Sequence, residues 1–88
     1  MRRTYVADLR VDDRVKQEFL LREVQLQTTR RGDSLLRVRL ADRSGSINGI
    51  LHNPHEGVVG RLRDSVGAMV TGYVSEYHEQ VQISIDSI

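Results

Sequence analysis

The 88-residue chain is 28% charged, carries a formal net charge of +1 and contains no cysteine. This length allows one small domain, residues 1–88, and the lack of cysteine excludes a disulfide framework and a cysteine-ligated zinc site. No stretch is long and apolar enough to cross a membrane, and the first residues lack the apolar core of a signal peptide, so we expect a cytoplasmic protein that makes no membrane contact. Residues 1–14 show no regular pattern and are expected to form an irregular lead-in.

The first predicted strand, residues 15–28, changes phase half-way along. Phe19 and Leu21 share one parity, whereas Val24 and Leu26 take the other. A single flat strand cannot bury both pairs on one side, because successive side chains point to opposite faces. A β-bulge at the Arg-Glu pair before Val24 would reverse the phase, so we expect both Val24 and Leu26 to be buried.

A β-hairpin is predicted next. Residues 36–40 alternate leucine or valine with arginine, which is the period-2 pattern of a half-buried strand. Residues 42–45, Asp-Arg-Ser-Gly, predict a tight turn, because Asp accepts hydrogen bonds from nearby backbone and Gly tolerates a positive φ. Ile47, Gly49 and Leu51 then continue the inward face. The hairpin therefore has an apolar inner face and a basic outer face.

A short helix is predicted after the hairpin. Asn53 is a candidate N-cap, Pro54 suits the first helical position, and Glu56 lies three residues after Asn53, as in a capping box. Residues 58–62 add an apolar stripe of two valines and a leucine. We expect this stripe to plug one end of a barrel.

Two further strands complete the predicted fold. Residues 68–75 and residues 80–86 both alternate in hydrophobicity, and residues 76–79 form the turn between them. Val81 is expected to point inward with the isoleucines of its strand. Three strands, a short helix and two more strands, with a long first strand, predict an all-β, five-stranded OB-fold Greek-key barrel.

Five ordered motifs also carry a family resemblance. They are Ala7-Asp-Leu9, Phe19-Leu-Leu21, Leu-Ala-Asp-Arg-Ser-Gly-Ser-Ile at 40–47, Val-Thr-Gly-Tyr-Val at 70–74, and Glu-Tyr-His-Glu-Gln-Val-Gln-Ile at 76–83. Together they resemble the N-terminal OB domain of YhaM-type 3′–5′ exoribonucleases, and more loosely the OB domains of single-strand-binding proteins such as replication protein A. The resemblance spans essentially the whole chain. It implies an accessory domain of a larger hydrolase that binds single-stranded RNA or DNA with little sequence preference.

The resemblance also implies where the nucleic acid would bind. The ligand would cross the outer face of the second and third strands, between the loops that join strands one and two and strands four and five. The residues carried over are Leu35, Arg37 and Arg39, then Asn48, Ile50 and His52, with Arg30 and Arg31 in one loop and Tyr77 and His78 in the other. Cations of this set would contact phosphates, while rings would stack on bases. The family pattern has aromatic residues at Leu35 and His52, so we expect fewer stacked bases and weak binding.

Other functions find less support in the sequence. The histidines lack the spacing of a metal site, and none is followed by Asp as in the catalytic motif of these nucleases, so we predict neither a cofactor nor an enzymatic activity of the domain itself. The alternative is an OB domain that contacts protein, either a second copy or a partner domain beyond Ile88. The near-neutral charge and the few aromatic residues, three tyrosines and one phenylalanine, favour this alternative.

Overall fold

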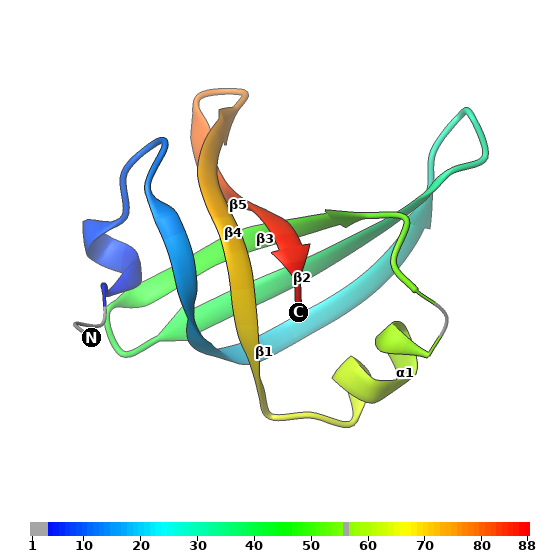
Figure 1. The fold of residues 1–88 in the computed structure, drawn as a ribbon, viewed down its shortest axis with the longest axis horizontal. Helices are drawn as coiled ribbons and strands as arrows, with labels where there is room; N and C mark the ends of the chain where they lie inside the picture. The colour runs from blue at the N-terminus through cyan, green and yellow to red at the C-terminus, as the bar shows by residue number, and fades with distance from the viewer. Residues whose placement is uncertain (1–3, 56) are drawn as a thin grey trace.

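In residues 4–55 and 57–88, which the computed structural model describes, five strands close into a barrel (Figure 1). The elements are the 3-10 helix η1 (Val6–Asp8), β1 (Arg14–Thr28), β2 (Ser34–Asp42), β3 (Gly45–His52), the helix α1 (Val58–Arg63), β4 (Gly67–Tyr77) and β5 (Gln80–Ser87). The strand order is β1-β2-β3-β5-β4, and β4 pairs back onto β1. Strands β3 and β5 run parallel, whereas the other neighbours are antiparallel. This topology confirms the predicted all-β OB-fold barrel.

The bulge predicted in β1 is present, but its consequence is only half as expected. The register between β1 and β2 shifts between Leu21 and Glu23, and Val24 then packs against the core. Leu26, however, is 48% exposed, so the prediction that it is buried is wrong. The reason is that pairing between β1 and β4 ends at Leu20, beyond which the β1–β2 hairpin projects from the barrel as an arm (Figure 1). We call residues 24–34 the arm.

The barrel core comes from the alternating strands. Its fully buried side chains include Leu36, Val38 and Leu40 of β2, Val70 and Val74 of β4, and Ile83 of β5. The alternation of β5 predicts that Val81 joins this set, but Val81 is 43% exposed. It lies opposite Glu76 at the start of β5, before the strand reaches β3, whose pairing begins at Gln82. No neighbouring layer therefore covers Val81.

Helix α1 begins later than predicted. Gly57, with a φ of +88°, is the N-cap, and the helix starts at Val58. Asn53 is not the cap, because its Oδ1 accepts a hydrogen bond from the Ser34 backbone at 3.1 Å, and its own N–H donates to the Ser34 carbonyl at 2.8 Å. Asn53 thus closes the end of the β2–β3 pair, while Glu56, the expected capping-box partner, lies outside the described residues.

The apolar stripe of α1 faces the barrel as predicted. Leu62 is 2% exposed and belongs to the core, and Val58 and Val59 pack against it. The helix lies beside the bend of β1 (Figure 1). Within residues 4–55 and 57–88, no helix has the length and apolar character needed to cross a bilayer.

The predicted Asp-Arg-Ser-Gly turn also fastens the lead-in to the barrel. Asp42 Oδ1 accepts hydrogen bonds from the backbone N–H of Ser44 at 2.8 Å and from its hydroxyl at 2.6 Å. The other oxygen, Oδ2, accepts one from the Val6 N–H at 2.9 Å. Arg43 lies over the Tyr5 ring, 4.8 Å from its centroid, and donates a hydrogen bond to the Tyr5 hydroxyl. One turn therefore holds both β3 and the first described residues.

Candidate nucleic-acid interface

Six of the predicted binding residues form three successive cross-strand pairs on the outer face of β2 and β3. The pairs are Leu35 with His52, Arg37 with Ile50, and Arg39 with Asn48. Side chains directly opposite each other in an antiparallel pair share a face, with Cβ atoms about 4.5–5.5 Å apart. The register therefore confirms that these six residues share one face.

A hollow of about 250 Å³ lies over this face. Its lining consists of Leu35 and Arg37 of β2, Ile50 and His52 of β3, Tyr77 of β4 and Gln82 of β5. We call it the Tyr77 hollow. Tyr77 is 62% exposed, and its ring meets the His78 ring nearly edge-on, with the centroids 4.1 Å apart. The guanidinium of Arg37 and the rings of His52 and Tyr77 therefore line one concave site.

A second hollow, of about 590 Å³, adjoins the first. It is lined by Val6, Arg39, Ser46, Ile47, Asn48, Glu79, Gln80 and Val81, and we call it the Glu79 hollow. Arg39 and Asn48 follow the Arg37–Ile50 pair on the same face, so the two hollows lie next to each other along it, and we refer to them together as the groove. Arg39 Nη1 donates a hydrogen bond of 3.0 Å to Asn48 Oδ1, which holds the guanidinium over the strands.

Ile50 is less exposed than predicted. Its side chain has the outward parity expected of it, yet it is only 8% exposed. Ile50 lies between its strand partners, Arg37 on β2 and Ser84 on β5, and Tyr77 lines the same hollow. It therefore forms part of the apolar floor of the groove instead of an exposed contact. Leu35, on the same face, is also half-buried.

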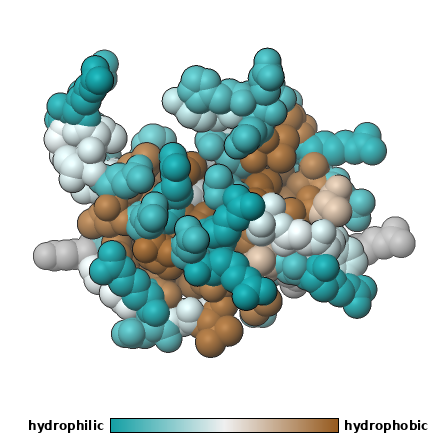
Figure 2. All heavy atoms as spheres, turned by 180° about the vertical axis from the view of Figure 1, so that it is seen from behind, coloured by the Kyte–Doolittle hydropathy of each residue, from teal (hydrophilic) through white to brown (hydrophobic). Residues whose placement is uncertain are grey.

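The two loop arginines lie away from the groove. Arg30 and Arg31 are exposed at the tip of the arm and line neither hollow. The tip is closed by a hydrogen bond from the Thr29 N–H to the Asp33 carbonyl at 2.8 Å, and Gly32 supplies the positive φ of +86°. In Figure 2 the hydrophilic tip projects at the upper left, clear of the body, whose hydrophilic side chains leave apolar surface between them. These arginines can contact only a ligand that extends along the arm.

The turn between β4 and β5 is shorter than predicted and sets the position of Tyr77. Only His78 and Glu79 separate the last residue of β4 from Gln80, and both have left-handed backbones, with φ of +51° and +64°. Two such residues suit a tight hairpin, because this turn matches the twist of the strands. Each costs roughly 1–2 kcal/mol in this conformation when it is not glycine. The tight turn places Tyr77 in the lining of the Tyr77 hollow, whereas His78, also a predicted contact, lines neither hollow and lies against the Tyr77 ring.

Sequence reasoning missed the polar residues that β5 contributes. Gln82 lines the Tyr77 hollow and Gln80 lines the Glu79 hollow. Gln82 has outward parity on β5 and pairs with Asn48 in the parallel β3–β5 ladder. The outward parity was visible in the sequence, but the neighbour of β5 was not, because it lies more than thirty residues away along the chain.

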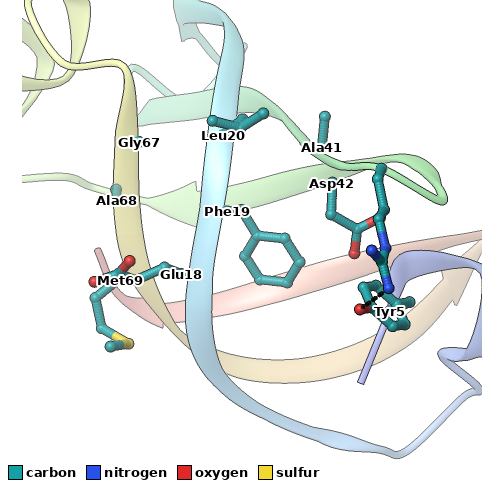
Figure 3. Close-up of a pocket in the computed structure, with 10 residues that line it drawn as sticks. Tyr5, Glu18, Phe19, Leu20, Ala41, Asp42, Gly67, Ala68 and Met69 are labelled. Carbon is teal, nitrogen blue, oxygen red and sulfur yellow. Dashed lines mark hydrogen bonds between the residues drawn. The ribbon is translucent and has the colours of Figure 1, made fainter. Parts of the chain in front are cut away.

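A larger hollow, of about 650 Å³, lies outside this face. It is bounded by β1, the start of β4 and the Asp42 turn, and Figure 3 shows Phe19 and Tyr5 at one side of it, with Met69 and Glu18 beyond β1. None of the ten predicted binding residues lines it. We therefore place the candidate interface on the groove.

The groove carries more positive than negative charge. Among the described residues that line its two hollows, Glu79 is the one carboxylate, against the guanidinium groups of Arg37 and Arg39. In the same described part of the chain, no group of three His, Asp or Glu residues is placed to hold a metal ion.

Comparison with protein-family models and with curated proteins found no match for this chain. The function is therefore proposed from the groove together with the resemblance in the sequence.

Proposed function

We propose that the chain binds single-stranded RNA or DNA along the groove, with little sequence preference. The observation that carries the proposal is the Tyr77 hollow, where Arg37, His52 and Tyr77 come together from three strands. Single-strand-binding sites combine cations that contact phosphates with rings that stack on any base. Following the sequence resemblance, the domain serves a larger hydrolase as its substrate-binding part and performs no catalysis itself.

The two arginines of β2 have different parts in this proposal. Arg37 is exposed and, within the described residues, its guanidinium forms no hydrogen bond or ion pair, so its full fork of donors is available to a phosphate. Arg39 is half-buried and held by Asn48, so it loses less side-chain entropy when a phosphate binds. The hollow floor of Leu35 and Ile50 gives a base an apolar surface beneath the Tyr77 ring.

The salt dependence of binding tests the proposal. We expect a labelled oligonucleotide of about 12 nucleotides to bind in fluorescence anisotropy, and its affinity to fall between about 50 and about 200 mM salt. In the double variant Arg37→Ala and Arg39→Ala, the slope of log K against log salt should become shallower by about 0.7 for each phosphate that an arginine no longer neutralises. The melting temperature should change little, because both side chains lie on the outer face.

Arg63→Ala is the matched control, because Arg63 is an exposed arginine on α1, outside both hollows. It should leave affinity and slope near those of the unmodified chain. Equal affinity and slope in the double variant would exclude the groove as the binding surface. Absence of any binding at low salt would reject the proposal and favour protein contact.

A tryptophan in place of His52 should tighten binding. His52 lines the Tyr77 hollow and is exposed, so a larger ring can lie there without displacing the core. We expect a gain of up to about 1–2 kcal/mol, the range for one stacked base. His55→Trp adds the same ring three residues later, outside the Tyr77 hollow, and should not change affinity. Equal effects of both substitutions would show that the hollow does not hold a base.

A further inference from the structure

One edge of the arm is open. β1 pairs with β4 over residues 14–20 but with β2 as far as Thr28. The Leu21 N–H is bonded to the Val66 carbonyl at 2.8 Å, and beyond this point the far edge of β1 has no strand partner within the described residues. Such an edge presents alternate backbone N–H and C=O groups that can pair with another strand.

The part of the open edge beyond the bulge at Arg22 and Glu23 lacks the features that usually prevent pairing. Residues 24–29, Val-Gln-Leu-Gln-Thr-Thr, contain no charge, proline or glycine, in a chain that is 28% charged. Leu26 at the centre is 48% exposed, and Gln25 and Gln27 are exposed beside it. Natural edge strands are commonly protected by charged side chains or proline. This segment is therefore suited to addition of a strand.

We propose that this edge pairs antiparallel with the same edge of a second copy of the chain, about a twofold axis at Leu26. The segment is nearly palindromic about that residue. With Leu26 opposite its own copy, Gln25 lies opposite Gln27 and Val24 opposite Thr28. These pairs match apolar with apolar, amide with amide and one β-branched side chain with another. A twofold contact requires this self-complementarity, so a second copy fits the edge.

The pairing would place both grooves on one side of the joined arms. Gln25 pairs with Arg37 and Gln27 with Leu35, so these glutamines share the face of the groove, whereas Leu26 shares the core face with Leu36. A twofold axis perpendicular to the paired arms keeps the groove faces of the two copies on the same side and their core faces on the other side. One single strand could then cross two copies, a consequence that rests on the proposed function. The ladder is only a few residues long, so the dimer is weak and reversible.

A single cysteine tests the register. The chain has no cysteine, so Leu26→Cys introduces its one thiol. Residues directly opposite in an antiparallel pair have Cα atoms about 4.5–5.5 Å apart, within the range of about 4.4–6.8 Å that a disulfide spans. Under mild oxidation, Leu26→Cys should form a covalent dimer at least about tenfold faster than Met69→Cys, because prior association brings the thiols together. Met69, on β4, is 50% exposed and therefore a matched control.

Sedimentation equilibrium of the native chain supplies a second test that also needs no nucleic acid. We expect the apparent mass to rise with concentration, and Leu26→Glu to abolish the rise by placing two like charges opposite each other. Met69→Glu should leave it unchanged. The dimer is overturned if both cysteine variants cross-link equally fast, or if the native chain stays monomeric at all concentrations. Because these readouts omit nucleic acid, their failure is separate from failure of the groove to bind it.

Discussion

Replacing Gly72 by alanine should cost roughly 3 kcal/mol or more, a large part of the about 5–15 kcal/mol by which a domain of this size is stable. A Cβ atom at Gly72 would collide with the Ser84 carbonyl oxygen, and would lie 3.0 Å from the Ser84 carbonyl carbon and 3.1 Å from the Ile85 Cα. These are backbone atoms of β5, so relief would require moving the strand. The pairing of β4 with β5 already shifts register between Thr71 and Gly72. Urea denaturation followed by circular dichroism measures the loss.

Gly60→Ala is the control for this substitution. An ideal Cβ at Gly60 meets nothing within 4 Å, and the residue lies inside α1. Alanine is favoured over glycine in a helix interior by about 1 kcal/mol, so this variant should be more stable than the parent chain. If Gly72→Ala instead kept the denaturation midpoint of the parent, the close approach of β5 to β4 would be wrong.

Leu40→Ala should destabilise the barrel by about 2–5 kcal/mol, the range for truncating a buried leucine. Leu40 is fully buried, and β2 holds it between Leu21 of β1 and Ile47 of β3. The surrounding strands are joined by backbone hydrogen bonds on both sides, so they cannot collapse to fill the space. A domain of this size has a total stability of about 5–15 kcal/mol, so the loss would be a large part of it. Urea denaturation at a fixed protein concentration gives the value.

Leu20→Ala provides the comparison for Leu40. Leu20 is 45% exposed on β1, so its truncation should cost about 1 kcal/mol or less. A similar loss in both variants would mean that burial in the barrel does not distinguish the two leucines. An unchanged midpoint for Leu40→Ala would place that side chain outside the core.

The groove depends on the short parallel ladder between β3 and β5. That ladder joins only residues 48–50 to residues 82–84 among those described. Before the ladder begins, Ser46 and Ile47 of β3 and Gln80 and Val81 of β5 line the Glu79 hollow. Where the ladder begins, Gln82 and Tyr77 close the Tyr77 hollow over Ile50. The path of β5 therefore decides where a ligand could be held.

The sequence by itself predicted the elements whose signals are local. Alternation with period 2 predicted each strand, because it depends only on neighbouring residues. The Asp-Arg-Ser-Gly turn was predicted from side-chain chemistry within four residues, and Asp42 bonds Ser44 as expected. The bulge in β1 followed from the reversal of parity between Leu21 and Val24. The resemblance implied one outer face for the six β2 and β3 residues, and the register of the two strands agrees with it.

Only the tertiary structure decided which of these side chains are covered. Leu26 has core parity but is exposed, because β4 ends its pairing at Leu20. Ile50 has outward parity but is buried, because β5 lies beside it and Tyr77 lines the same hollow. Asn53 bonds Ser34 across the sheet instead of capping the helix. The position of a residue in the alternation predicts the face of the strand on which its side chain lies. Its burial depends on where other strands, distant in the sequence, begin and end, and no local pattern carries that information.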